Sequence, residues 1–396
     1  MARDAPQRRV HVLHETRYSY EHPVSQSWQL AHLRPRELPG QRLVGHALRI
    51  EPRPDWIDHG DDYFGNPVVR FAIHASHEAL DVTAESTVLL APPAPDSAAA
   101  GQPWERVADA VASGRGPLAV EVAQFAVPSP QVPRSRRAHL YARRSFLPGA
   151  AFVPAVRDLA HRIHRDFEFD PAATTVTTPL EEVFAHRRGV CQDFAHLMIA
   201  CLRSHGLAAR YVSGYIVTRP PPGKPRLVGA DASHAWVSAF CPGQGWVDVD
   251  PTNDRRADQD FVTLGWGRDF IDVTPLRGVI LGSGAQELEA RVTVTPVGEG
   301  GGAVAGAAGA AGRSAWRGWG VGRRRSGDRG PPACGARAAL RCLRRPRGPT
   351  ARSSRTLRRD PVAAPAHPPS ALREGGLTQV SRNELAASPA GPGPSG

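Results

Sequence analysis

The spacing of the apolar residues changes once along the chain, near residue 150, and this change limits the folds that are available. Up to residue 92, short apolar-rich or alternating runs such as "RVHVLHETRYSY" and "LDVTAESTVLL" have the pattern of strands with one buried face. From about residue 151 the period becomes helical, as in "VPAVRDLAHRIHRDF". Strands in one block, followed by helices and further strands in another, predict an α+β protein.

Four segments follow from these patterns. Residues 8–92 predict a small antiparallel β domain or sandwich, with a clear turn at "DYFGNP". Residues 93–150 begin with a linker-like stretch and predict one or two helices. Residues 151–297 predict a second domain of helices and then strands, which closes with a last strand. Residues 298–396 are rich in Gly, Ala, Pro and Arg without any period, and predict a disordered basic tail.

The net charge of +11 is confined to the tail. Residues 297–396 hold 17 Arg and five acidic residues, whereas the first 296 residues hold 32 basic and 33 acidic side chains. The predicted folded part therefore lacks the basic surface that binding to a phosphate backbone requires. We expect no specific nucleic-acid partner, and we interpret the arginine-rich tail as a solvated segment.

The cysteine usage and the absence of long apolar runs indicate the compartment. The five cysteines form no CxxC pair, so neither a disulfide framework nor a zinc site is expected. The N-terminal residues offer no apolar segment for a signal peptide, and no run approaches the roughly 18 apolar residues of a membrane span. These features favour a cytoplasmic protein without membrane contact. The oligomeric state is not readable from the sequence.

A cysteine stands at the predicted start of a helix in the stretch "RRGVCQDFAHLMIACLRSHG". We expect this helix to be buried on one face and to end at Gly206. Its apolar face holds Phe194, Leu197, Met198, Cys201 and Leu202 at helical spacing. Cys191 lies in the first turn, where unpaired N–H groups and the helix dipole favour a thiolate and can stabilise an oxyanion. A lone cysteine is more often a small buried apolar residue, which is how we interpret Cys201.

A nucleophilic thiol needs a base, and the base needs an orienting group. The stretch "SHAWVSAF" offers His234 on a predicted strand, and "GWVDVDPTND" offers Asp248 and Asp250 on the next one. Neighbouring antiparallel strands would bring the imidazole close to one of these acids. Because side chains alternate along a strand, both acids share a face, and the pleat alone leaves the choice between them open.

The stretches "GVCQDFAHL", "ASHAWV" and "GWVDVDPTN", in this order, resemble the transglutaminase-like superfamily, and "HETRYSYEHPVSQSWQLAHLRPR" resembles the N-terminal β domain of its bacterial branch. The resemblance covers about residues 8–297 and implies a papain-like core preceded by a small β domain. It implies that Cys191 is the nucleophile, His234 the base and Asp250 the orienting acid, with Asp248 as the second choice. Gln192 and Asp193 would shape the site without a chemical step.

The activity that this resemblance implies is cysteine-dependent acyl transfer on protein or peptide amides, without metal or organic cofactor. Water as the second nucleophile would make the enzyme a protease or amidase, and an amine would make it a transglutaminase. The same three residues serve both reactions, so the sequence leaves them open. The alternative is a binding or scaffolding module that keeps the fold without catalysis. An intact Cys, His and Asp set argues against that alternative.

Two histidine pairs have spacings that a metal site could use. His11 and His14 lie in "HVLH", and His161 and His164 lie in "HRIHRD". No acid or thiol set converges on either pair in the sequence, so we predict solvated surface histidines rather than metal ligands.

Overall fold

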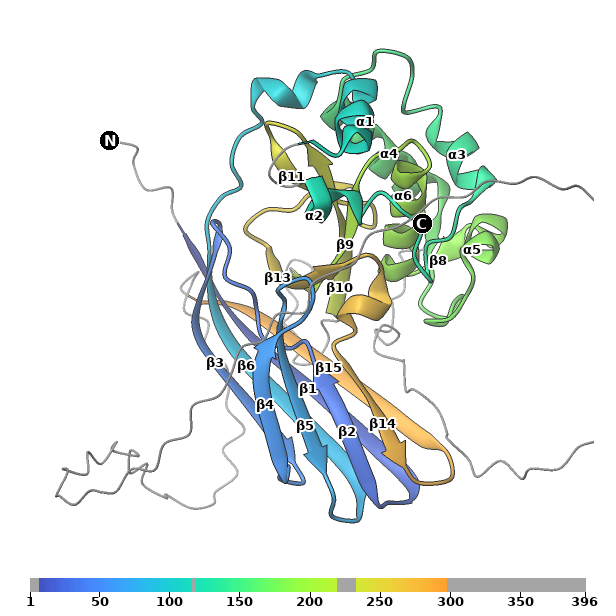
Figure 1. Ribbon diagram of the computed structural model, residues 1–396. Helices are drawn as coiled ribbons and strands as arrows, with labels where there is room; N and C mark the ends of the chain where they lie inside the picture. The colour runs from blue at the N-terminus through green and yellow to red at the C-terminus, as the bar shows by residue number, and fades with distance from the viewer. Residues whose placement is uncertain (1–6, 116–118, 219–232, 298–396) are drawn as a thin grey trace, which may run out of the picture. The chain divides into compact units, whose positions relative to one another are not determined.

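A computed structural model of the protein describes residues 7–115, 119–218 and 233–297, which all belong to one compact unit (Figure 1). They form a β-sandwich and a five-stranded antiparallel sheet with helices, which confirms the predicted α+β class with a β domain before the core. The predicted tail, residues 298–396, lies outside the described residues. No helix in the described ranges is long and apolar enough to span a membrane.

The sandwich consists of two four-stranded antiparallel sheets. One sheet has the order β15 (Gln286–Val297), β1 (Arg8–Val24), β6 (His77–Leu90) and β3 (Gln41–Glu51). The other has the order β14 (Leu276–Leu281), β2 (Gln26–Ala31), β5 (Pro67–Ile73) and β4 (Trp56–Asp61). Alternate residues of these strands point inward and form a shared apolar core around Tyr18, Phe71, Ile73, Leu80 and Val82, as the alternating sequence pattern requires.

The sequence predicts one last strand at the end of residues 151–297, whereas the structure has two strands there, β14 and β15, and both pair with strands of the sandwich. β15 pairs with β1 along its whole length, and β14 pairs with β2. Val292 and Val294 of β15 are buried in one cluster with Val10 and Val12 of β1. The alternating pattern predicts a strand correctly, but the sheet that the strand joins is set by long-range pairing. The other domain boundaries stay predictions.

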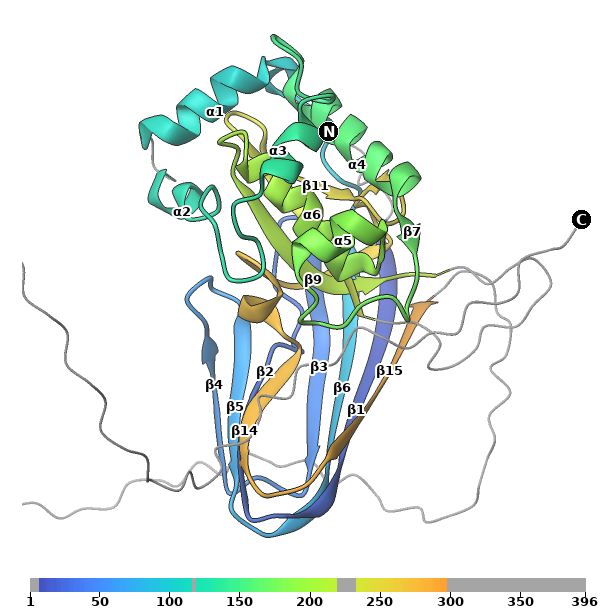
Figure 2. The same ribbon diagram turned by 90° about the vertical axis from the view of Figure 1, so that its right-hand side faces the viewer.

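The second part contains a sheet in the order β12 (Arg255–Arg256), β11 (Gly245–Asp250), β10 (Ser233–Cys241), β9 (Ala209–Ile216) and β13 (Phe261–Gly267), all antiparallel. Its helices are α1 (Trp104–Ser113), α2 (Ala119–Ala123), α3 (Arg136–Ala142), α4 (Phe152–Asp166), α5 (Leu180–His186) and α6 (Cys191–Arg203). Two short 3-10 turns, η1 (Ala98–Gly101) and η2 (Phe270–Val273), and the two-residue parallel strands β7 (Glu168–Phe169) and β8 (Arg188–Gly189) complete it. Figure 2 shows α5 and α6 lying over β9.

Helix α6 is the centre of this core. It packs on β10 and β9 and is surrounded by α3, α4 and α5. All thirteen of its residues are buried, whereas the sequence predicted burial on one face. The polar residues Gln192, Asp193 and His196 of this helix are covered by the loop 170–179 and by η2, which contribute hydrogen bonds. A helix covered on every side holds its first residue in a fixed place.

The predicted turn at "FGNP" joins the two parts of the fold. Gly65 has a φ of +70°, which favours glycine at this position. The Asn66 side chain is fully buried, donates to the carbonyl oxygen of Trp266 on β13 and accepts from the Trp266 N–H. Arg36 stacks over the Trp266 ring at 3.6 Å and donates to Asn66.

One of the four histidines predicted to lie at the surface is buried. His14 on β1 is fully covered and bonds through Nδ1 to the Tyr215 hydroxyl at 2.8 Å. The prediction was wrong here because the end of β9, which supplies Tyr215, packs onto the sandwich. His161 and His164 are exposed and bond to the Asp254 carboxylate and the Thr252 carbonyl, and His11 bonds to Glu85.

We expect the protein to lose stability steeply between pH 6.5 and pH 4, because burial lowers the pKa of both His14 and His196 from 6.5 to about 4. In that window these two histidines are protonated in the unfolded chain but not in the folded chain, so the free energy of unfolding falls as the pH falls. Each histidine then costs about 2 kcal/mol between pH 7 and pH 5. Urea unfolding at both pH values measures this loss. His14→Gln should reduce it and His11→Gln, on the same strand, should not; equal losses in all three proteins would contradict the prediction.

Candidate active site

The start of α6 is built around an acid that caps the helix. The Asp193 Oδ2 atom accepts the backbone N–H of Val190 at 2.8 Å and the Thr174 hydroxyl at 2.6 Å. A Cβ atom on Gly189 would lie 2.6 Å from this oxygen, so only glycine fits there. Burial raises the pKa of Asp193, although both hydrogen bonds favour its charged form. The carboxylate thus fixes the turn that presents Cys191 as the first residue of the helix.

His234 lies on β10 and meets an acid at the end of β11. Its Nε2 atom is 2.7 Å from the Asp250 Oδ2 atom, and both side chains are buried. The other carboxylate oxygen of Asp250 accepts the backbone N–H groups of Thr252 and Asn253 at 2.8 and 3.3 Å. These bonds from the turn after β11 hold the carboxylate with one oxygen directed at the imidazole.

Cys191 is the third member of this group. Its thiol is close enough to His234 to raise the pKa of the imidazole through a side-chain hydrogen bond and through its charge. The Cys191 side chain is buried, with 6% of the residue exposed. The three residues that the sequence selected from distant positions are therefore neighbours, and we refer to sulfur, imidazole and carboxylate together as the row.

Within this row, His234 and Asp250 each stabilise the charged form of the other. Burial opposes the imidazolium form of His234, but the charge and hydrogen bond of Asp250, together with Cys191, raise its pKa from 6.5 to about 10. Burial likewise opposes ionisation of Asp250, but His234 and the bonds from Asn253 and Thr252 hold its pKa below the usual range. Both directions follow from an ion pair in a site of low polarity. His234 is consequently protonated at neutral pH.

Asp248, the second choice for the orienting acid, points elsewhere. It lies on the same face of β11 as Asp250 but two residues back, where Arg210, Ser238 and Trp236 surround it. Burial raises the pKa of Asp248 despite the charge of Arg210. The Arg210 guanidinium is itself sandwiched between the rings of Trp246 and Trp266, at 4.1 and 3.7 Å from their centroids. Asp248 therefore belongs to the cluster around Arg210 and does not bond to the His234 imidazole.

Two residues near the row were missed in the sequence. The Asn253 side chain donates to Asp250 Oδ2 at 2.7 Å and lies 3.4 Å from His234 Nε2. Its position three residues after Asp250, in "DPTN", was the available signal for a turn that holds the acid. Tyr211 on β9 is buried, and its pKa is raised by burial and then by nearby Cys191. No local pattern marks a buried tyrosine as a neighbour of the thiol.

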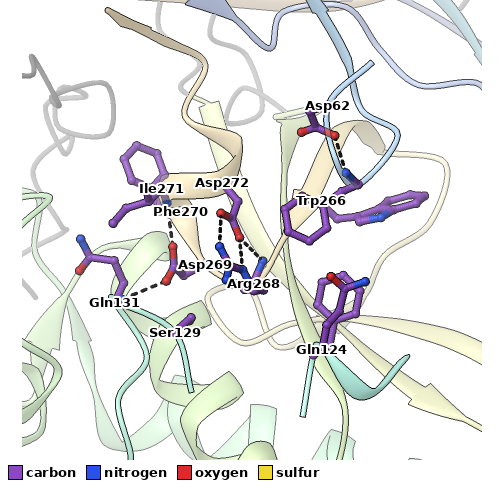
Figure 3. Close-up of polar contacts among 12 residues, drawn as sticks. Asp62, Gln124, Ser129, Gln131, Trp266, Arg268, Asp269, Phe270, Ile271 and Asp272 are labelled. Carbon is purple, nitrogen blue, oxygen red and sulfur yellow. Dashed lines mark hydrogen bonds and ion pairs between the residues drawn. The ribbon is translucent and has the colours of Figure 1, made fainter. Parts of the chain in front are cut away.

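The segment after β13 packs against the middle of α6. Asp269 accepts the backbone N–H of Ile271 at the start of η2, and that of Gln131 from the loop before α3 (Figure 3). The Phe270 N–H donates to His196 Nε2 in α6, and Arg268 forms a two-pronged pair with Asp272. These bonds anchor α6 at its middle, away from the thiol.

The other described cysteines lack such partners. Burial raises the pKa of both Cys201, inside α6, and Cys241, at the end of β10. Cys201 lies in the apolar core, as expected. Within the described residues, no group of three or more His, Cys, Asp or Glu side chains could hold a metal ion.

Comparison with known proteins identifies the family. Residues 10–89 match the bacterial transglutaminase-like N-terminal region, and residues 148–251 match the transglutaminase-like superfamily core. An uncharacterized protein of Mycobacterium tuberculosis is 44% identical over 279 residues, which cover 69% of this chain and 87% of that protein. The chain belongs to the transglutaminase-like superfamily. The family is one of cysteine-dependent enzymes, and the matched core contains Cys191, His234 and Asp250.

Further relatives agree with this assignment. An uncharacterized protein of Mycobacterium leprae is 33% identical over 294 residues, 72% of this chain and 98% of its own length. A crystal structure from Cytophaga hutchinsonii, provisionally assigned as a cysteine protease, aligns with a TM-score of 0.58 at 18% identity. It covers 75% of this chain and 93% of that one, and shows that the two share a fold.

Proposed function

We propose that the protein catalyses acyl transfer from protein or peptide amides through a thioester on Cys191. The observation that carries the proposal is the position of His234, which interacts with both the Cys191 thiol and the Asp250 carboxylate. A thiol paired with a protonated imidazole can act as the nucleophile and has a proton donor for the leaving amine beside it. Asp250 keeps the imidazole oriented and charged.

In the first half of the reaction the sulfur of Cys191 bonds to the amide carbonyl carbon. The carbon–nitrogen bond breaks, His234 gives its proton to the departing amine, and a thioester remains. The N–H groups at the start of α6 favour the oxyanion that forms on the way, and that of Cys191 is the nearest donor. In the second half, water or an amine attacks the thioester, its proton passes to His234, and the carbon–sulfur bond breaks.

The choice of the second nucleophile decides between hydrolysis and transfer. A protein-glutamine gamma-glutamyltransferase of Pseudomonas aeruginosa is 33% identical over 121 residues, which are 30% of this chain but only 18% of that protein. The Cytophaga hutchinsonii structure carries the name of a protease. Both reactions use the row described above, and we propose the shared thioester step for this protein.

The test incubates the full chain with a library of peptide amides, with and without a primary amine, and identifies the products by mass spectrometry. We expect either free acids or amine adducts from the parent protein. Cys191→Ala should give neither free acids nor amine adducts. Cys201→Ala, a change in the same helix, should retain the activity in the fraction of the protein that is folded. Turnover by Cys191→Ala would contradict the proposal. A folded parent protein without turnover on any amide would favour a non-catalytic binding module.

A further inference from the structure

A cavity lies at the opposite end of α6 from Cys191. It has a volume of about 380 Å³ and is formed by the last turn of the helix and the segment 126–139. Cys191 is the first residue of α6 and Arg203 the last, so at 1.5 Å per residue the cavity lies about 18 Å from the thiol. The volume falls at the lower end of the range for small-molecule sites.

The charged side chains of the cavity wall are all basic. Arg134, Arg136, Arg203 and His139 line it, and no acidic residue does. Arg134 and Arg136 are exposed and form no ion pair with any part of the chain that the structure describes. Arg137, the residue after Arg136 in α3, pairs with Glu181. Two unpaired guanidinium groups at the mouth of one cavity create a positive potential that favours an anion.

Arg203 is held rigidly in the wall by oxygen atoms that carry no net charge. It donates to the carbonyl oxygens of Phe125, Ala209 and Arg268 and to the Ser129 hydroxyl. In the ranges that the structure describes, no carboxylate forms a hydrogen bond or ion pair with the Arg203 guanidinium, and Asp269 and Asp272 act on its charge only at longer range while they accept hydrogen bonds from other groups (Figure 3). The two exposed arginines therefore supply most of the positive potential at the mouth.

The rest of the wall is apolar. Pro128, Pro133, Val127, Val132 and Ala200 contribute to it, and the prolines restrict the backbone on the loop side. Apolar walls with a few charged groups on one side are typical of sites that bind an organic molecule by its body and orient it by its charge. The carbonyl end of α6 disfavours an anion, so the arginines must supply the attraction.

We propose that this cavity binds a small organic anion, a carboxylate on an apolar body, at a site separate from the acyl-transfer site. The carboxylate pairs with Arg134 and Arg136, and the apolar body fills the space between the two prolines and Ala200. Two guanidinium groups suit the planar, two-oxygen geometry of a carboxylate. The proposal does not depend on the reaction at Cys191.

The test uses 2-naphthoate as the probe and its neutral counterpart 2-naphthamide, with calorimetric titration of the full chain at low and moderate salt. We expect saturable binding of 2-naphthoate that weakens with salt, and at least tenfold weaker binding of the amide. The double change Arg134→Gln and Arg136→Gln should weaken 2-naphthoate at least tenfold. The matched change Arg143→Gln and Arg144→Gln, directly after α3 and outside the cavity wall, should alter binding less than twofold.

Two further variants separate the cavity from other sites. Val127→Trp, at a half-exposed position of the wall, should fill the cavity and abolish binding while the protein stays folded by circular dichroism. Cys191→Ala should bind 2-naphthoate as the parent does. Three outcomes would each overturn the proposal. They are equal affinity for the amide and the acid, undiminished binding of 2-naphthoate to the Arg134 and Arg136 double variant, and no binding at about 10 mM probe, on the order of the weakest useful affinity.

Discussion

Asp250→Asn is expected to lower kcat/KM by about 10⁴-fold at neutral pH, the loss typical when an orienting carboxylate becomes an amide. Asp250 supplies the main interactions that raise the pKa of His234 to about 10, and burial acts in the opposite direction. With the carboxylate gone, burial remains and the pKa of His234 falls. The imidazole then loses its proton at neutral pH, and the leaving amine loses its acid.

Two measurements follow this change, and the first needs no substrate. NMR titration of the His234 ring should show protonation persisting up to about pH 10 in the parent protein and ending at a lower pH in Asp250→Asn. In the pH profile of kcat/KM, the fall in activity at alkaline pH should begin at a lower pH, by the same shift as the pKa of His234. Asp248→Asn is the matched control, since Asp248 lies on the same strand face but contacts Arg210 and Ser238. Loss of activity in Asp248→Asn, with Asp250→Asn unaffected, would reverse our assignment of the orienting acid.

Gly214→Ala is expected to destabilise the protein by about 3 kcal/mol and to reduce activity by about 100-fold. Gly214 on β9 is the residue directly paired with His234 on β10. An added Cβ would lie 2.0 Å from the Val262 carbonyl oxygen and 2.7 Å from the Trp236 ring. The carbonyl belongs to the neighbouring strand and cannot rotate away. The Trp236 ring stacks on the His234 imidazole, so any shift of the indole moves the base.

Urea unfolding and kcat/KM of the same preparations measure the two effects. Gly45→Ala is the matched control, because Gly45 is also a strand glycine, in β3, and a Cβ there would meet no atom within 4 Å. We expect that control to stay within about 0.5 kcal/mol of the parent. A Gly214→Ala protein as stable and as active as the parent would show that β9 can move relative to β13 without cost.

His14 and His196, two of the histidines with a lowered pKa, differ from His234, whose pKa is raised, for a physical reason. His14 and His196 are buried against hydroxyl and backbone groups, a Tyr215 hydroxyl in one case and the Phe270 N–H in the other. His234 is buried against a carboxylate. Burial disfavours the charged ring in all three, and only a neighbouring negative charge outweighs it. Their sequence contexts do not distinguish these surroundings.

The sequence by itself determined the local structure and the chemistry of the site. Alternation fixed the strands, and the change of period fixed the helices. The position of Cys191 before an apolar helical face placed a thiol at a helix start, because spacing decides which face a side chain occupies. The family pattern selected His234 and Asp250 as partners, and the geometry of the Asp250–His234 contact agrees with it.

Only the tertiary structure decided which elements meet. It moved β14 and β15 into the sandwich, buried α6 on every side and covered His14 with the end of β9. It also turned Asp248 toward Arg210 and brought Asn253 to Asp250. A residue's own pattern sets its backbone conformation and its face, whereas its partners come from segments up to hundreds of residues away. Those contacts depend on the packing of the whole core, and a short stretch of sequence carries no information about it.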